Sequence, residues 1–194
     1  MARAVILASG SGSNFQALAE AIEGTKHSLT ALICDRKGAG CFERAEKLNI
    51  SARYINYAEK KREAVEQELL DIVNSTGCDI IFLAGFMRLI TPFFLDNFAG
   101  PVINIHPSLL PKYPGTHGIE ESYGSGDLEL GITIHKVDYG MDTGPVICQR
   151  SFIRSGRESL EEIEVKIHEL EHLWYPKTAI ELLDKSEINS EVKQ

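Results

Sequence analysis

Asn104 and His106 are the side chains of this sequence whose types and spacing best suit acid–base chemistry. They lie in the segment Asn104–Pro111, which begins inside an apolar run typical of a buried strand. Residues two apart on an extended chain point the same way, so both side chains can face one ligand. An amide donor beside a titratable ring can stabilise an oxyanion and move a proton. A polar loop with two hydrogen-bonding residues would have the same sequence, and this feature leaves both interpretations open.

A carboxylate that could act with this pair is Asp142, in the loop Asp138–Pro145. That loop can return to the same edge of a sheet. A carboxylate beside an imidazole favours the charged ring and raises its pKa. The alternative is an Asx turn before Gly144 and Pro145.

A glycine-rich loop, Ser9–Asn14, stands between a predicted strand and a predicted helix. Its glycines allow close approach of a ligand, and the following helix N-terminus favours an anion. A dinucleotide fingerprint needs glycine where Phe15 stands, although Asp35 at the end of the second strand fits a ribose-binding role. The loop therefore favours a single phosphate over a dinucleotide or a purely structural turn.

The segment His168–His172 reads His-Glu-Leu-Glu-His and matches the HExxH motif of zinc peptidases. Only three positions of that motif are fixed, and a Glu-rich helix meets them easily by chance. A solvated charged face is the better interpretation, so we expect no metal. Glu171 remains a candidate for contact with a ligand.

The elements that would position these residues alternate along the first half of the chain. Such alternation predicts a doubly wound, mostly parallel α/β sheet with a Rossmann-like N-terminal half, in which ligands bind at the carboxyl ends of the strands. The predicted strands are Ala4–Ala8, Leu29–Cys34, Arg53–Ile55, Ile80–Ala84 and Val102–Ile105; the predicted helices are Asn14–Ile22, Cys41–Leu48, 60–75 and a short one from Thr91-Pro92.

The second half changes character. Residues 106–127 are rich in proline and glycine, with at most a short helix near Glu120. Leu130–Val137 and Pro145–Ile153 could pair as neighbouring strands. Ser159 and Glu162 form a capping box that opens a long helix, which Pro176 should kink or break. We expect one domain, 1–185, and a frayed polar tail, 186–194.

Composition limits the partners. The 194 residues suit about one domain, and the net charge of −8 argues against a general binder of nucleic acid or membrane surfaces. There is no membrane-spanning apolar run and no signal peptide. The cysteines lack metal-site spacing, and apolar runs around three of them indicate buried free thiols in a cytoplasmic protein. They are Cys34, Cys41, Cys78 and Cys148.

With these residues assembled, the chain resembles the glycinamide ribonucleotide formyltransferases of purine synthesis, of the single-domain type. The likeness runs from residue 3 to about 180. Its most specific parts are Asn104–Gly115, Leu83–Arg88 and Asp142–Ile147. The resemblance implies a formyltransferase-like fold and transfer of a formyl group from 10-formyltetrahydrofolate to the amine of glycinamide ribonucleotide, without a metal.

The resemblance also implies roles for individual residues. Asn104 and His106 match the catalytic pair, and Asp142 matches the acid that orients the histidine and raises its pKa. Gly12, Ser13 and Asn14 match the loop that holds the substrate phosphate, and Glu171 matches the residue that holds its ribose. His135 matches a histidine near the active site, and His117 receives no role. The folate pocket would be lined by Arg62, Met87, Arg88, Leu89, Ile90, Asn104, Asp138, Tyr139, Gly140, Met141 and Asp142.

Four other functions compete with this prediction. A formyltetrahydrofolate hydrolase usually adds an N-terminal regulatory domain, and a methionyl-tRNA formyltransferase usually adds a basic C-terminal domain; the length and acidity disfavour both. A non-catalytic protein that binds a phosphorylated metabolite and a zinc peptidase are the remaining alternatives. The expected partners are therefore small-molecule substrates, with no nucleic acid or membrane, and a monomer or homodimer as the assembly.

Overall fold

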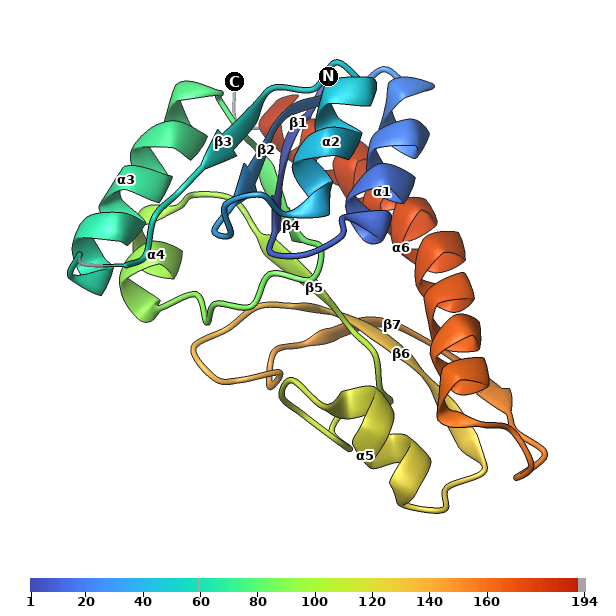
Figure 1. Ribbon diagram of the computed structural model, residues 1–194. Helices are drawn as coiled ribbons and strands as arrows, with labels where there is room; N and C mark the ends of the chain where they lie inside the picture. Colours follow the sequence, from blue (N-terminus) through green and yellow to red (C-terminus); the bar gives the residue numbers. More distant parts are fainter. Residues whose placement is uncertain (59, 192–194) are drawn as a thin grey trace.

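The structure is a computed structural model that describes the backbone of residues 1–58 and 60–191 (Figure 1). Its strands and helices alternate as the apolar pattern predicts, and the predicted boundaries differ from the observed ones by at most two residues. In chain order they are β1 (Arg3–Ala8), α1 (Ser13–Glu23), β2 (Ser28–Cys34), α2 (Gly40–Lys47), β3 (Ala52–Tyr54), α3 (Arg62–Ser75), β4 (Ile80–Leu83), α4 (Pro92–Asn97), β5 (Val102–His106), α5 (Gly118–Gly124), β6 (Glu129–Lys136), β7 (Val146–Ile153) and α6 (Leu160–Glu191).

The strands form one seven-stranded sheet in the order β3-β2-β1-β4-β5-β6-β7. All neighbours from β3 to β5 are parallel, whereas β6 runs antiparallel to β5 and β7 antiparallel to β6. The predicted doubly wound, mostly parallel sheet is confirmed, and so is the pairing of the last two strands.

Both faces of the sheet are covered, which explains why β1 is apolar at successive positions. Ala4, Ile6 and Ala8 pack in a core with residues of α1, α2 and α6. Val5 and Leu7 point the other way and pack with residues of α3 and α4. Figure 1 shows α1 between α2 and α6 on one side of the sheet, with α3 and α4 on the other.

The helix α6 continues through Pro176, so a break at this residue was a wrong expectation. Proline removes one helix hydrogen bond, but the residue before it is held firmly. Tyr175 is fully buried, lies edge-on against Phe82 at 5.9 Å, and approaches the carbonyl oxygens of Leu83 and Ile103 at 2.9 and 3.0 Å with its hydroxyl. This tertiary packing offsets the loss of that hydrogen bond, so the helix continues beyond Pro176. α6 runs into the predicted tail 186–194, of which residues 192–194 lie outside the described part.

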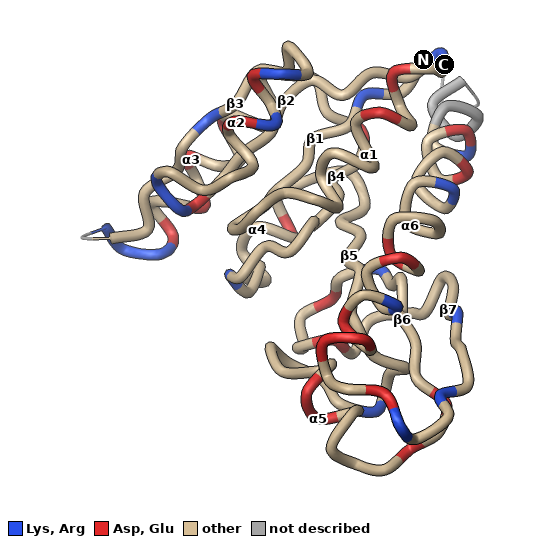
Figure 2. Tube along the Cα trace, turned by 45° about the vertical axis from the view of Figure 1, so that its right-hand side comes forward, with Lys and Arg blue, Asp and Glu red and all other residues tan. Residues whose placement is uncertain are grey.

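Acidic and basic residues are interspersed along the described part of the chain (Figure 2). Together with the net charge of −8, this pattern argues against a general polyanion-binding field. No described helix is long and apolar enough to cross a membrane. The thiols of Cys34 and Cys41 are buried, whereas Cys78 and Cys148 are only partly buried, and all four are free. The burial prediction therefore holds for the first pair and overstates it for the second.

Candidate active site

The predicted trio of Asn104, His106 and Asp142 comes together on one face of the sheet. Ile103 and Ile105 turn into the core under α6, so by the alternation of β5 the side chains of Asn104 and His106 project from the opposite face. The loop between β6 and β7 returns over that face. It places Asp142 with one oxygen 3.5 Å from Nδ1 of His106 and the other 3.5 Å from Nε2 of His135.

His135 extends this cluster because the antiparallel register sets it directly opposite Asn104. Its Nε2 lies 3.2 Å from the amide nitrogen of Asn104, and its Nδ1 lies 3.1 Å from the carbonyl oxygen of Lys136. A carbonyl only accepts, so Nδ1 is the donor. The neutral ring then accepts from Asn104 at Nε2, and the protonated ring can donate there to Asp142.

His106 is held between two acceptors. Its Nε2 donates to the carbonyl oxygen of Tyr113 at 2.7 Å, while Nδ1 faces Asp142. The protonated ring can therefore donate at both nitrogens. The ring is 3% exposed, and a Cβ atom at Gly118 would stand 3.0 Å from Nε2, so a glycine there leaves the ring its space.

Asp142 is fixed in the ionised form by its surroundings. Burial favours the neutral acid, but the hydrogen bond with His135, the N–H of Gly115 at 2.8 Å and the charge of His106 outweigh it and lower the pKa of Asp142. Its backbone has a φ of 56°, a left-handed conformation that aspartate and asparagine adopt more readily than most residues. The site thus holds one negative charge between two imidazoles.

The glycine-rich loop leads into the N-terminus of α1 in a geometry suited to an anion. Gly12 has a φ of 80°, no side chain caps α1, and no acidic residue occupies its first turn. From α2, the Arg44 Nε donates to the carbonyl oxygen of Ser11 at 2.8 Å. The loop thereby combines free helix N–H groups with a nearby cation.

Gly12→Ala should destabilise the protein strongly, because the new Cβ would lie 2.6 Å from Cβ of Cys41 on a left-handed backbone. We expect a loss of about 2–5 kcal/mol in the free energy of unfolding, measured by urea denaturation. Gly10→Ala in the same loop is the matched control, because a Cβ there meets nothing within 4 Å. Equal stability of the two variants would contradict this account of the loop.

The predicted ribose contact, Glu171, reaches the phosphate loop from α6. Its Oε2 accepts from the amide of Asn14 at 2.9 Å, and His168 Nδ1 lies 2.9 Å from the same oxygen. The hydrogen bond with Glu171 raises the pKa of His168. In the HExxH segment, His168 is thus bound to a carboxylate of its own helix, and among the described residues no group of His, Cys, Asp and Glu is arranged to hold a metal ion.

The segment after β4 carries the other predicted ligand contacts. Met87 and Leu89 are about half exposed, whereas Ile90 is 2% exposed. Arg88 donates from Nε to Asp35 at 2.6 Å, and Arg62 donates from α3 to the carbonyl oxygen of Leu89. Both oxygens of Asp35 are occupied by protein donors, which argues against a ribose-binding role for it.

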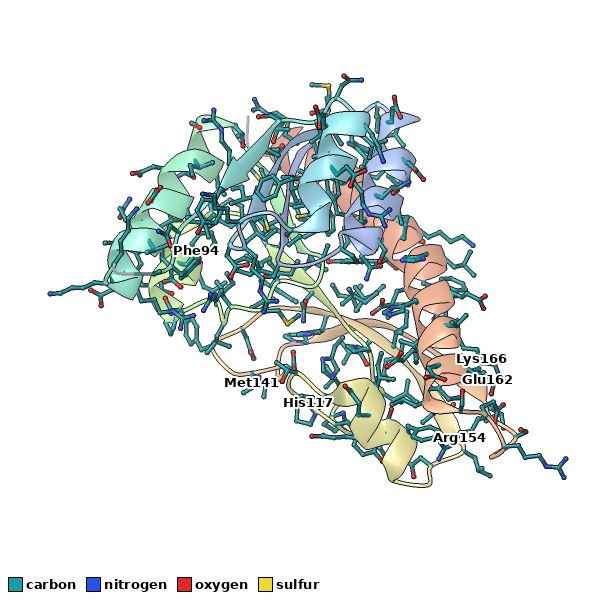
Figure 3. All side chains as sticks on the ribbon, viewed as in Figure 1. Phe94, His117, Met141, Arg154, Glu162 and Lys166 are labelled. Atoms are coloured by element: carbon teal, nitrogen blue, oxygen red, sulfur yellow. The ribbon has the colours of Figure 1, made fainter. Side chains whose placement is uncertain are left out.

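The loop Asp138–Asp142 is held by one hydrogen bond within it and by one to α4. Asp138 accepts from the N–H of Gly140 at 3.1 Å, and Tyr139 donates its hydroxyl to Asp96 at the end of α4. Met141 is 57% exposed, and Figure 3 places it at the margin of the molecule near His117, which precedes α5. The loop offers apolar surface next to the catalytic cluster.

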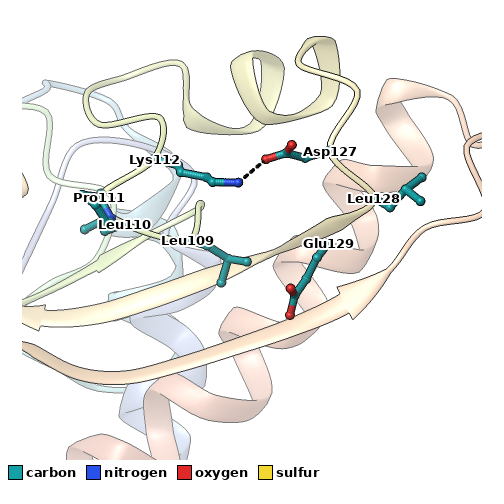
Figure 4. A pocket seen from close by; sticks show the side chains of 7 residues that line it. All are labelled: Leu109, Leu110, Pro111, Lys112, Asp127, Leu128 and Glu129. Atoms are coloured by element: carbon teal, nitrogen blue, oxygen red, sulfur yellow. Dashed lines mark hydrogen bonds and ion pairs between the residues drawn. The ribbon is translucent and has the colours of Figure 1, made fainter.

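Two cavities stand out among the described residues. One, of about 630 Å³, is a groove between α1, α2 and α6 lined by Ser13, Gln16, Arg44 and His172 among others. The other, of about 420 Å³, lies behind Leu109–Lys112 and is crossed by the Lys112–Asp127 ion pair of 2.7 Å (Figure 4). The first adjoins the phosphate loop, and the second contains none of the predicted site residues.

Sequence reasoning missed Arg44, Tyr113 and Gly115. The sequence weakly indicated the role of Arg44, because in a parallel sheet the helix that follows β2 can reach the loop that follows β1. Tyr113 and Gly115 act through backbone groups, which their side chains do not reveal.

Comparison with known proteins shows which family the chain resembles. The sequence pattern of the formyl transferase family matches residues 2–179. The chain is 40% identical to the phosphoribosylglycinamide formyltransferase of Bacillus subtilis, covering 94% of this chain and 95% of that protein, and 38% identical to that of Escherichia coli, covering 89% and 82%. The crystal structure of glycinamide ribonucleotide transformylase 1 from Geobacillus kaustophilus is similar with a TM-score of 0.90 and 42% identity, over 94% of this chain and 99% of that one.

Proposed function

The chain belongs to the formyl transferase family, among the phosphoribosylglycinamide formyltransferases of purine biosynthesis, and we propose on that premise that its donor is 10-formyltetrahydrofolate. The primary amine of glycinamide ribonucleotide attacks the formyl carbon directly. The observation that carries this proposal is that Asn104, His106 and Asp142 lie on one sheet face, with Asp142 3.5 Å from His106 and linked to Asn104 through His135. An anion-binding loop and an apolar loop accompany them.

The amine's attack makes a tetrahedral carbon with a negative oxygen. The side chain of Asn104 projects beside His106 and has N–H groups to offer, of which one is engaged with His135. Donation from Asn104 stabilises that oxygen, and protonated His106 adds a second donor when the substrate oxygen replaces the carbonyl of Tyr113 as the acceptor at Nε2. One such donor is typically worth about 3 kcal/mol of barrier. Asn104 also contacts the folate in this arrangement.

A proton must leave the attacking amine, and one must reach the departing folate nitrogen. Asp142 is ionised and lies between two imidazoles, so it can hold a water or pass a proton to His106. The transfer replaces one N–C bond by another and needs no enzyme-bound nucleophile. General acid–base assistance of this kind contributes roughly 10²–10⁴-fold to the rate.

Separate groups hold the two substrates. Gly12, Ser13 and Asn14 bind the phosphate through the N-terminus of α1, and Glu171 binds the ribose. Arg44 adds positive potential near that phosphate, and His168 offsets the negative charge of Glu171 by its hydrogen bond to that carboxylate, so an acidic protein can still bind an anion there. The folate lies between the segment after β4 and the loop before β7, with Arg62 of α3 beside the first of these. The two segments supply Met87, Arg88, Leu89, Ile90, Asp138, Tyr139, Gly140, Met141 and Asp142.

The decisive experiment follows 10-formyltetrahydrofolate spectroscopically with a chelator present. We expect its deformylation only when glycinamide ribonucleotide is added, with one formylated nucleotide formed per folate released. Folate turnover without the nucleotide would instead indicate a hydrolase. Activity that disappears with the chelator and returns with added zinc would contradict the metal-free mechanism.

A further inference from the structure

Asp35 is a buried carboxylate that joins three neighbouring strand ends. Its side chain is 0% exposed; Oδ1 accepts from the hydroxyl of Ser9 at 2.5 Å, and Oδ2 accepts from Nε of Arg88 at 2.6 Å. The hydroxyl oxygen of Ser9 in turn accepts the backbone N–H of Met87 at 2.8 Å. Asp35 follows β2, Ser9 follows β1, and Met87 and Arg88 come after β4.

The three ends lead to different parts of the site. Ser9 is the first residue of the glycine-rich phosphate loop, Ser9–Asn14, and its own N–H donates to the carbonyl oxygen of Gly85 at 3.2 Å. Met87 and Arg88 begin the segment that faces the folate. A shift of the loop at Ser9 therefore pulls on the N–H of Met87, and a shift of Arg88 pulls on Asp35.

From this connection, we propose that Asp35 is a positioning residue that makes the two substrates bind cooperatively. The inference rests on the proposed function. Asp35 fixes the position of the phosphate loop relative to the folate-facing segment. A ligand that orders one of these two segments therefore also orders the other one. Asp35 touches neither substrate and acts through Ser9 and Arg88.

The chemistry requires a carboxylate at this position. Ser9 O–H and Arg88 N–H are both donors, and a carboxylate can accept both. An amide of nearly the same shape accepts only at its oxygen, so its NH2 group must face either Arg88, which can only donate, or Ser9, whose hydroxyl would then have to turn and accept. Asp35→Asn therefore either loses the Arg88 contact or replaces the acceptance from Ser9 by a neutral donation to an oxygen that already accepts the Met87 N–H, so one of the two connections is weakened with little change in packing.

Glu66 supplies a matched control. It is another carboxylate with a 0% exposed side chain, and it accepts from the backbone N–H of Thr91 at 3.2 Å and from Nε of Arg62 at 3.5 Å. Those contacts hold the far end of the folate-facing segment and do not reach the phosphate loop. Glu66→Gln should weaken folate binding but leave unchanged the factor by which the nucleotide tightens it.

The test is calorimetric titration of tetrahydrofolate, with and without saturating glycinamide ribonucleotide, a pair that cannot react because no formyl group is present. For the wild type we expect the nucleotide to tighten folate binding about five- to tenfold. Asp35→Asn should reduce that factor to near one, and Glu66→Gln should keep it. Ser9→Ala leaves the Asp35–Arg88 pair intact, but it should also reduce the factor to near one. This variant replaces Asp35→Asn in the test if Asp35→Asn does not fold.

Two results would overturn the inference and leave the proposed function intact. One is a wild-type factor of one with both ligands bound; the other is an unchanged factor in Asp35→Asn or Ser9→Ala. Failure of the wild type to bind either ligand would overturn the proposed function as well.

Discussion

His106→Ala is expected to lower kcat by roughly 10²–10⁴-fold, the largest effect of any single substitution in this site. The ring is the group that can both donate to the developing oxyanion and carry a proton. The variant should fold, because the hydroxyl of Ser108 lies 3.1 Å from the carbonyl of Tyr113 as well as 2.6 Å from that of Lys112, and can share its proton with the carbonyl that has lost the ring. The measurement is the steady-state rate at saturating concentrations of both substrates.

A rate within about fivefold of the wild type would refute the role of His106 in the chemical step. The KM for each substrate should change less than kcat, because the transition state loses more than the ground state does. Thermal unfolding followed by circular dichroism serves as the control for an intact fold.

Asp142→Asn should give the second largest loss, about 10²-fold or more in kcat. The amide keeps the shape and tolerates the left-handed backbone at φ 56°, so the change removes little except the charge between His106 and His135. Asp71→Asn, an exposed residue of α3, is the control for removing one negative charge from the whole protein. Equal kcat in both variants would exclude a role for the Asp142 charge.

The same substitution has a pH signature in stability. Because the fold lowers the pKa of Asp142, its ionisation stabilises the folded state fully above the unfolded aspartate pKa of about 3.9. That contribution is lost as the pH falls through the folded-state pKa. The difference in unfolding free energy between wild type and Asp142→Asn should therefore shrink on acidification, as measured by urea denaturation at successive pH values.

The parts of the site that follow from local pattern were predictable. Apolar runs locate the strands, and a spacing of two places Asn104 and His106 on one face. The glycines before α1 indicate an anion-binding loop. Each of these rests on a period or a steric rule that acts within a few residues.

The parts that depend on register or on distant packing were not derivable from the residues. His135 lies opposite Asn104 only because β6 pairs antiparallel with β5 in one register, and a slip of one residue would turn its side chain to the other face. The path of α6 through Pro176 depends on Tyr175 and its partners on β4 and β5. Asp35 gave a plausible but misleading signal, since nothing local reveals that Ser9 and Arg88 occupy both oxygens.

The left-handed backbone at Asp142 also limits how this position can evolve. Of the residues one nucleotide change away from aspartate, asparagine and glycine fit that conformation best, and both lack the carboxylate. Glutamate keeps the charge but fits the backbone less well and carries a longer side chain. Substitutions that fit the backbone thus remove the carboxylate, and the one that keeps the carboxylate strains the backbone. We therefore expect selection against each of these changes at position 142.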